Sequence, residues 1–453
     1  MNKSHDMQQT KYGRKILLFP LPLQGHINPM IQLANILHSK GFSIVIIHTS
    51  FNSLDSSNYR HFTFHSIPDR LSEDEASTED VIALLSILNV RCVEALRNCL
   101  AKLVLDECLG CLITDVMWYF ARGVAEQFKI PTIGLRTTNV CSFLGFAAFP
   151  LLRDLGYLSI HEGRLDEAVQ ELPPLRVKDI PTIQTKDPDT LYNLIDKVMN
   201  QTKEFSGLIW NSCEELEQHS FQKLKKDFPI QMYPIGPFHK HFQALSTSLL
   251  PQDQTCISWL DTKPPNSVLY VSFGSIAAIT KAEFHEIAWG LANSNHPFLW
   301  VVRPGLVGGS GWFEPLPDGF MEMVGERGCI VKWAPQQEVL GHPAIGGFWT
   351  HNGWNSTLES ICEGVPMICM PNFGDQMVNA RYVSDVWGVG IHLEGKIKRE
   401  DVKIAIKRLL EEEEGKDLKK RVLHLKEKLD LCSREGGSSY CYLENLINYI
   451  LSL

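Results

Sequence analysis

Short apolar runs, each long enough for one β-strand, alternate with longer stretches of helical periodicity through the first half of the chain. The strand-length runs are Lys15–Pro20, Phe42–His48, Gly110–Asp115, Pro131–Leu135 and Gly207–Asn211. Amphipathic stretches such as Asn28–Ser39 and Asp80–Leu103 lie between them. This alternation predicts a parallel sheet with helices on both faces, and hence a doubly wound α/β domain.

The alternation stops at Pro234–Pro237, and the polar stretch His239–Gln254 that follows has little periodicity. A second set of strand-length runs then begins: Ser267–Phe273, Pro297–Val302, Gly328–Lys332, Ile345–Thr350 and Val365–Met370. Helical spacing returns at Lys281–Asn293, Asn355–Glu363, Asp375–Val386 and Arg399–Glu411. We therefore predict one α/β domain over residues 1–238, a linker over residues 239–255 and a second α/β domain over residues 256–436.

The composition is that of an ordinary globular protein and excludes several classes of partner. Of 453 residues, 44% are apolar and 21% are charged. The net charge is -9, so no general positive field attracts nucleic acid or anionic lipid. No apolar run approaches the roughly 20 residues of a membrane-spanning helix, and the leader Met1–Lys15 is polar. We expect a cytoplasmic protein without a secretory signal.

The twelve cysteines give no metal or disulfide framework. Many lie inside apolar runs, which is typical of reduced core thiols. The single Cys-x-x-Cys pair, Cys108 and Cys111, lacks a second pair to complete a zinc site, and packing is the better interpretation. The glycine-rich stretch Gly305–Gly311 lacks the third glycine of a dinucleotide fingerprint and the lysine of a P-loop, so we predict a mobile loop.

The segment Trp333–Gln376 concentrates residues suited to a nucleotide sugar. A strand ends near Thr350, and a short polar turn then leads into a helix, whose free backbone N–H groups offer a seat for a phosphate. His351, Asn355 and Ser356 lie beside that helix end. Glu359, one turn farther on, can accept the two hydroxyls of a ribose, and Trp333 offers a flat face for a base. Taken singly, each residue is explained as well by helix capping or core packing.

These 44 residues resemble the signature box of the plant family-1 UDP-sugar glycosyltransferases. The initial Trp, the His-x-Gly-Trp-Asn-Ser core, the Glu and the closing Asp-Gln stand at the family's spacing, and the resemblance extends over essentially the whole chain. It implies a GT-B fold of two facing Rossmann-like domains. It also implies that a C-terminal helix, Ser439–Leu451 within residues 437–453, packs back on the first domain.

The resemblance implies a role for each residue of the box. Trp333 would stack on uracil, the Ala334 backbone would bond its edge, and Gln336 and Glu359 would bind the ribose. The residues that would hold the diphosphate are His351, Asn355, Ser356 and Ser275. The residues that would bind the sugar hydroxyls are Trp354, Asp375 and Gln376. In this family a final Gln goes mostly with glucose, which favours UDP-glucose; Asn352, where many members have Cys, implies no change of chemistry.

The catalytic base is predicted at the end of the first strand. Among 16 histidines, His26 follows Pro20–Gly25 at the carboxyl end of the first strand, just before a helix is expected to begin. Asp115 ends another strand, so both side chains reach the same edge of the sheet. His26 can take the acceptor proton while Asp115 fixes its tautomer, and the family uses a His–Asp dyad at these positions. Asp115 alone could instead cap a helix at Trp118. Direct displacement would invert the anomeric carbon and give a β-glucoside.

The Asp187-Pro188-Asp189 triplet matches the Asp-x-Asp of metal-dependent transferases of another fold. It lies in a polar stretch away from any predicted strand end, so we expect a loop and no metal. The helix end near Asn355 can hold a diphosphate without an ion.

The acceptor is predicted to lie against aromatic residues of the first domain, with Trp118, Phe143 and Phe146 as candidates; core packing explains each of them equally well. Thr137 is expected near the sugar 6-hydroxyl because the family often places a Thr there. Arg136 either pairs with an acceptor carboxylate or is a surface charge.

Together these features predict a UDP-glucose-dependent, metal-independent, inverting glucosyltransferase that needs no cofactor and acts as a monomer. The N-terminal sequence is similar to the branch that contains the steviol-glycoside and the salicylate or small-hydroxy-acid glucosyltransferases, so the acceptor is a hydroxyl or carboxyl of a small plant metabolite. A nucleotide-sugar-binding regulatory protein is the alternative, against which His26 and Asp115 argue. A nicotinamide oxidoreductase would need a Gly-x-Gly-x-x-Gly after a strand, which is missing.

Overall fold

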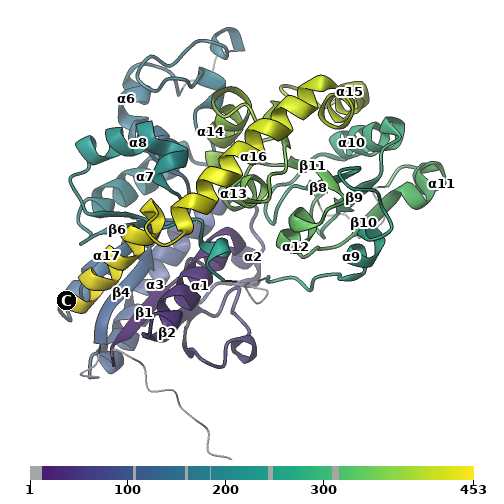
Figure 1. The fold of residues 1–453 in the computed structure, drawn as a ribbon. Coiled ribbons are helices and arrows are strands. Elements are labelled where there is room, and N and C mark those ends of the chain that lie inside the picture. The colour runs from purple at the N-terminus through teal and green to yellow at the C-terminus, as the bar shows by residue number, and fades with distance from the viewer. Residues whose placement is uncertain (1–12, 106–108, 159–161, 184, 243–247, 309–315) are drawn as a thin grey trace, which may run out of the picture. The chain divides into compact units, whose positions relative to one another are not determined.

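The computed structural model describes residues 13–105, 109–158, 162–183, 185–242, 248–308 and 316–453. The chain forms two compact units (Figure 1). The first comprises residues 1–137, 184–249 and 432–453, and the second comprises residues 138–183 and 250–431.

The first unit is built on a parallel sheet of seven described strands in the order β3-β2-β1-β4-β5-β6-β7. Their bounds are β1 Lys15–Phe19, β2 Ser43–Thr49, β3 Thr63–Ile67, β4 Leu109–Asp115, β5 Thr132–Arg136, β6 Leu208–Trp210 and β7 Met232–Pro234. Ile16 of β1 pairs with Ile44 of β2 on one side and with Cys111 of β4 on the other. The strand order reverses at β1 and β4, and such a switch point is where open α/β sheets bind ligands.

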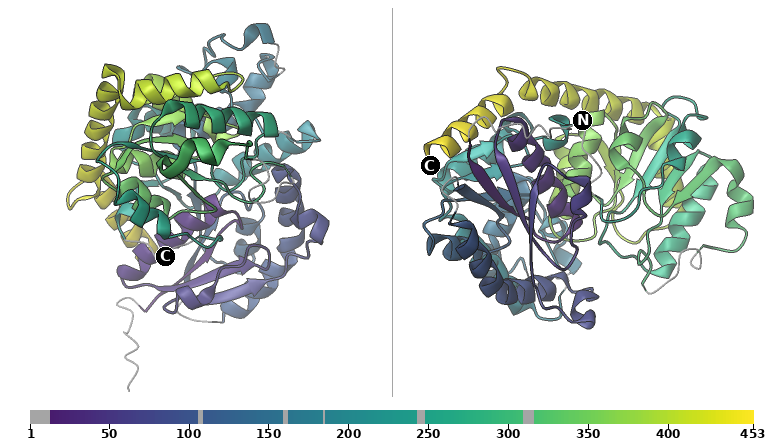
Figure 2. Two further views of the ribbon diagram at one scale, coloured as in Figure 1. Left: turned by 90° about the vertical axis from the view of Figure 1, so that its right-hand side faces the viewer. Right: turned by 90° about the horizontal axis from the view of Figure 1, so that it is seen from below.

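Helices cover both faces of this sheet (Figure 2). They are α1 Gln24–Ser39, α2 Glu73–Ala76, α3 Val81–Leu103, α4 Ala121–Glu126, α7 Pro188–Thr202, α8 Glu214–Asp227 and α17 Ser438–Ser452. The last helix, α17, buries Leu443, Leu446, Ile447 and Ile450 in one apolar core with Ile16 and other strand residues. This burial, rather than chain order, makes the C-terminus part of the first unit.

The second unit contains a parallel sheet of six described strands in the order β10-β9-β8-β11-β12-β13. The bounds are β8 Val268–Ser272, β9 Phe298–Val301, β10 Gly328–Val331, β11 Ile345–Thr350, β12 Met367–Cys369 and β13 Gly390–His392. Its helices are α5 Val140–Ala147, α6 Phe149–Asp154, α9 Thr255–Leu260, α10 Lys281–Ser294, α11 Phe320–Val324, α12 Gln336–Gly341, α13 Trp354–Glu363, α14 Asp375–Arg381 and α15 Arg399–Leu410. Helix α16, Glu413–Ser433, runs from this unit to the start of the first unit's last segment.

One segment falls in a different unit from the one that chain order predicts. Residues 138–183 belong to the second unit, whereas the predicted first domain runs without interruption to residue 238. Specific contacts hold the segment there. Asp179 forms a buried ion pair with Arg381 (Oδ2 to Nε, 2.7 Å), and the Asn139 amide donates to Oδ1 of Asn379 (2.7 Å).

Two local predictions are wrong. Helix α1 begins at Gln24, so His26 lies inside the first turn of the helix rather than before it. The Asp187–Asp189 stretch is the start of helix α7 and not a loop, because the Asp187 carboxylate caps the helix by accepting from the Asp189 N–H (3.1 Å). Residues 1–12 of the polar leader, Cys108 and part of the glycine-rich stretch after Gly305 lie outside the described residues.

In the part of the chain that the structure describes, no helix has both the length and the apolar character required to cross a bilayer.

Candidate functional site

An imidazole–carboxylate pair lies at the carboxyl edge of the first sheet. His26 is the third residue of α1, the first helix after β1, and Asp115 is the last residue of β4. Nδ1 of His26 lies 2.7 Å from Oδ2 of Asp115. The Asp115 side chain is 1% exposed and that of His26 is 22% exposed, so the carboxylate is fixed while part of the ring remains accessible. The two residues are brought together as the sequence predicted.

Two further contacts surround the imidazole–carboxylate pair. Oδ1 of Asp115 accepts from the Met117 N–H (2.9 Å), which leaves Oδ2 to accept a proton-bearing Nδ1 of His26. Oγ1 of Thr137, just after β5, lies 3.0 Å from the same Nδ1. With its proton on Nδ1, the imidazole keeps a free lone pair on Nε2, which is the state of a general base. The contact between Thr137 and His26 was not foreseen from the sequence.

Arg136 is buried, so its interpretation as a surface charge is wrong. Its guanidinium carbon lies 5.9 Å from the centre of the Trp210 ring. Burial lowers the pKa of Arg136 to about 9, and the negative charge of Asp115 opposes this shift.

The aromatic residues proposed for the acceptor are packed to different degrees. Trp118 is fully buried and stacks on Phe19 with ring centres 4.7 Å apart, and its indole N–H donates to the Pro20 carbonyl (3.1 Å). Phe143 is also fully buried. Both rings therefore serve as core residues here, which was the alternative interpretation. Phe146 is half-buried, at 5.4 Å from the ring of Phe149.

In the second unit, the predicted phosphate turn lies at the carboxyl ends of β8 and β11. Helix α13 begins at Trp354, and Gly353 before it has no side chain with which to cap the first turn. The His351 ring packs so closely on two glycines that a Cβ on Gly274 or on Gly353 would lie 2.5 Å from its Nε2. Gly274 also has φ +72°, so glycine is required there by both space and backbone.

Burial lowers the pKa of His351 to about 4; the nearby charge of Arg303 adds to this shift, and a hydrogen bond with the Ser272 backbone opposes it. The ring is therefore neutral at physiological pH and can donate one hydrogen bond without carrying charge.

Arg303, two residues after β9, is a positively charged residue of this edge that the sequence analysis missed. Its guanidinium donates to the carbonyls of Gly274 (2.9 Å), Pro304 (3.1 Å) and Ala277. These hydrogen bonds hold the loop that contains Ser275 in place. Ser275 itself is half-buried. The signal available was a charged residue directly after an apolar strand, the same signal that singled out Asp115.

The residues expected to bind the ribose form a single network. Gln336 donates from Nε2 to Oγ of Ser356 (2.9 Å) and to Oε2 of Glu359 (2.7 Å), and Gln337 donates to Oε1 of Glu359 (2.9 Å). Burial raises the pKa of Glu359, and the two glutamine hydrogen bonds oppose this effect. Each carboxylate oxygen keeps a second lone pair with which to accept a ribose hydroxyl.

Trp333 and Ala334 follow β10 at the same edge; Trp333 is half-buried and Ala334 is buried. The Trp333 carbonyl accepts from the Asp253 N–H (2.9 Å), which holds the backbone in place. In the turn itself, Trp354 is buried and Asn355 is half-buried.

A fully buried asparagine network supports the predicted sugar-binding residue Asp375. Nδ2 of Asn379 donates to Oδ2 of Asp375 (3.0 Å) and to the carbonyl of Asn352 (2.8 Å). Oδ1 of Asn379 accepts from Asn139. One amide therefore positions both the Asp375 carboxylate and the start of the phosphate turn, where Asn352 has φ +60°.

Gln376 is buried, and its carbonyl oxygen accepts from the N–H groups of Asn372 (2.9 Å) and Phe373 (3.2 Å). Its NH₂ group is therefore the part of the side chain suited to donate to a sugar hydroxyl.

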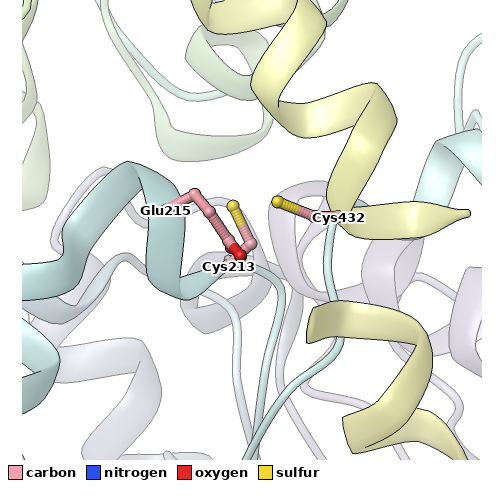
Figure 3. Close-up of side chains that lie close together, drawn as sticks. All are labelled: Cys213, Glu215 and Cys432. Carbon is pink, nitrogen blue, oxygen red and sulfur yellow. The ribbon is translucent and has the colours of Figure 1, made fainter. Parts of the chain in front are cut away.

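Among the described residues, one group has the chemistry and spacing to hold a metal ion: Cys213, Glu215 and Cys432 of the first unit (Figure 3). It shares no residue with the imidazole–carboxylate pair. Two residues that the sequence analysis considered as metal ligands have structural positions instead: Asp187 acts as a helix cap, and Cys111 is buried in β4.

Comparison with known proteins assigns this arrangement to one family. The family model described as "UDP-glucoronosyl and UDP-glucosyl transferase" matches residues 76–427. The chain is 54% identical over 438 residues to UDP-glycosyltransferase 76B1 of Arabidopsis thaliana, covering 96% of this chain and 98% of that protein. It is 48% identical over 452 residues to UDP-glycosyltransferase 76G1 of Stevia rebaudiana, covering 97% of each.

Solved structures give the same answer for the fold. UGT2 of Phytolacca americana, complexed with UDP-2-fluoro-glucose and pterostilbene, matches with a TM-score of 0.81 at 27% identity, over 96% of this chain and 99% of that one. A UDP-glucosyltransferase from Polygonum tinctorium that glucosylates indoxyl matches with a TM-score of 0.83 at 29% identity, over 97% and 99%. These matches, with the two parallel sheets, confirm the predicted GT-B class.

Proposed function

Because this chain belongs to the plant family-1 UDP-glycosyltransferases, we propose that it transfers glucose from UDP-glucose to a hydroxyl or carboxyl group of a small plant metabolite. Membership of this family by itself establishes that the protein transfers a sugar from a UDP-sugar to a small molecule. The observation that carries the catalytic part is the 2.7 Å contact between Nδ1 of His26 and Oδ2 of Asp115, which leaves Nε2 as a base.

The second unit is proposed to bind the donor. Trp333 stacks on the uracil and the Ala334 backbone bonds its edge, while Gln336 and Glu359 bind the ribose, with the Glu359 carboxylate accepting from its hydroxyls. The diphosphate lies against the first turn of α13, with Ser275, His351, Asn355 and Ser356 as hydrogen-bonding partners. Trp354, Asp375 and Gln376 bind the sugar, and the Gln376 NH₂ group favours glucose.

The transfer itself is proposed to be a direct displacement. Nε2 of His26 takes the proton of the acceptor hydroxyl while that oxygen forms a bond to C1 of the glucose. The bond between C1 and the diphosphate oxygen breaks, and UDP leaves with the electron pair. Asp115 stabilises the imidazolium that forms. Attack opposite the leaving group inverts C1, so the product is a β-glucoside; a carboxylate acceptor is already ionised and would give an ester without needing the base.

The leaving diphosphate is proposed to be stabilised by the protein alone. The helix N-terminus, the His351 N–H and the guanidinium of Arg303 nearby supply the positive potential that a metal ion supplies in other transferases. Turnover should therefore be unchanged after extensive treatment with a chelator. A strong loss of activity that manganese restores would contradict this and would return attention to Asp187 and Asp189.

A regulatory protein that binds a nucleotide sugar without turnover is the competing function. The two are separated by incubating the protein with UDP-glucose and a pool of small phenols and hydroxy acids. We expect UDP release that requires an acceptor, together with a product heavier by one hexose. In His26→Ala, transfer to alcohols should be abolished while UDP binding stays nearly intact; unchanged turnover in this variant would remove His26 as the base.

The acceptor is proposed to be a small phenolic, terpenoid or hydroxy acid bound by the first unit. The relatives support a phenolic: one is named flavonol 3-O-glucosyltransferase (43% identical), and the Phytolacca enzyme binds pterostilbene. Thr137 is proposed to lie near the sugar 6-hydroxyl, and its 3.0 Å contact with Nδ1 of His26 supports this proposal. Mass spectrometry of products from an acceptor library identifies the compound, and size-exclusion chromatography tests the proposed monomer. Imaging of a fluorescent fusion tests the proposed cytoplasmic location.

A further inference from the structure

Two cysteines far apart in the sequence meet inside the first unit. Cys213 directly precedes helix α8, and Cys432 is the second-last residue of α16. They are 1% and 2% exposed. Figure 3 shows the Cys432 side chain directed toward Cys213, with the two sulfur atoms near each other. Neither residue belongs to the catalytic pair or to the donor site, so the transferase function does not explain their juxtaposition.

A carboxylate completes the group. Glu215, the second residue of α8, is exposed, and one of its oxygens and the two sulfur atoms all lie within 4.8 Å of one another. Ser438, at the start of α17, donates to Oε2 of Glu215 (2.8 Å) and so restrains the carboxylate from the outer side. Three donor atoms of metal-binding type thus converge from two segments that are 219 residues apart.

We propose that Cys213, Glu215 and Cys432 bind a thiophilic divalent cation such as Zn²⁺. Zinc binds sulfur at about 2.3 Å and carboxylate oxygen at about 2.0–2.2 Å, so two sulfurs of a tetrahedral site lie about 3.8 Å apart. The donor atoms of the three residues lie within 4.8 Å of one another, so side-chain movements alone are enough to bring them to these distances. The exposed side of Glu215 admits water as the fourth ligand.

The chemistry of the two thiols fits binding that is coupled to proton release. The hydrogen bond with Cys432 and burial raise the pKa of Cys213 well above its ordinary value. The cation displaces both thiol protons to solvent and is held by two thiolates and one carboxylate. No electron transfer and no oxidant are involved.

Such a site would act on the fold rather than on the reaction. It joins the start of α8 to the segment that leads into α17, whose apolar face is part of the first unit's core. An ion that binds the folded protein and not the unfolded chain raises stability by mass action. Removing it should lower the melting temperature and leave the rate of sugar transfer at moderate temperature unchanged.

The test uses the full chain, reduced and freed of metal by chelation and gel filtration. Titration with Cd²⁺ should give the ultraviolet charge-transfer band of cadmium thiolate, saturating at a single equivalent, and Zn²⁺ should compete for the same site and raise the melting temperature. Cys213→Ser and Cys432→Ser should each lose the band and the thermal shift, and Glu215→Gln should bind more weakly. Cys441→Ser, at an exposed cysteine of α17, is the matched control and should bind as the wild type does.

X-ray absorption of the zinc-loaded wild type checks the ligands without any variant, should a serine variant fail to fold. Two sulfur neighbours and lighter oxygen neighbours are expected. The proposal is overturned by a zinc shell without sulfur, by a cadmium band that survives in both serine variants, or by reduced protein that takes up no cation. A disulfide between Cys213 and Cys432, seen as two missing thiols before reduction, would then be the true role of the pair.

Discussion

Replacing Asp115 by Asn tests the role of the carboxylate through the proton position on His26. Oδ1 of Asp115 accepts from the Met117 N–H, and an amide NH₂ group cannot accept there. The Asn side chain must therefore turn its oxygen to Met117 and its NH₂ group to Nδ1 of His26. Nδ1 then becomes an acceptor, and the proton moves to Nε2, where it removes the lone pair that a base needs.

The size of the effect follows from the contribution of the base. General-base catalysis is worth about 10²- to 10⁴-fold, so kcat for an alcohol acceptor should fall by this factor. At about 1.36 kcal/mol per tenfold change, the barrier rises by about 2.7–5.4 kcal/mol. UDP affinity should not change, because the residues proposed to bind the UDP part of the donor belong to the second unit.

The assay is acceptor-dependent UDP release measured with a series of acceptors of decreasing pKa. The loss should be largest for aliphatic alcohols, smaller for acidic phenols and smallest for carboxylates that are already ionised. Asp69→Asn, at a buried carboxylate that accepts from the N–H groups of Phe51 and Leu71, controls for a general effect of the substitution on the fold. An unchanged kcat with an alcohol, or an equal loss with every acceptor, would refute the reasoning.

Three further predictions concern the second unit. In Gln376→Glu the side chain can still accept from the loop N–H groups but has lost its donor, so KM for UDP-glucose should rise while the Kd of UDP stays the same. Gln376→His should also use UDP-glucose less well. Activity equal to that of the wild type in both variants would exclude a sugar contact. Asp179→Ala leaves the buried Arg381 with weaker partners, so urea denaturation should show a decrease of about 3 kcal/mol or more in the free energy of unfolding. A decrease of less than about 1 kcal/mol would show that the ion pair is dispensable. The lowered pKa of His351 means that the unfolded chain binds a proton there that the folded protein does not, so stability should be lost as the pH falls from about 6.5 to about 4. This loss should be smaller in His351→Gln, and identical pH profiles of the melting temperature would contradict it.

The sequence predicted the sheets well where strands are long and fully buried. β4 and β11 were located almost residue for residue because both are continuous apolar runs that end in a polar residue. β3, β7 and β13 were missed: β3 is largely exposed, and β7 and β13 have only three residues each. The equally short β6 and β12 were found because each lies inside a longer apolar run. The unit to which residues 138–183 belong was also not predictable, because it depends on tertiary contacts such as Asp179 with Arg381.

The candidate site was predictable to the extent that it is local. The phosphate turn and Glu359 lie in one continuous segment, and His26 and Asp115 each follow a strand that was recognised. Arg303 and Asn379 act on this site through the Gly274 carbonyl and the Asp375 carboxylate. The position of Arg303 after a strand could have marked it as a candidate, but no spacing in the sequence reveals which groups these two side chains contact. The same holds for Cys213 and Cys432, which only the folding of α16 and α17 brings together.

The most direct test of the account is the configuration of the new glycosidic bond. Proton NMR of the product made from UDP-glucose and an alcohol acceptor, recorded before any anomeric exchange, reports whether C1 was inverted. Displacement by an oxygen that His26 deprotonates predicts the β-glucoside alone. An α-glucoside, or UDP release that leaves only free glucose, would contradict it.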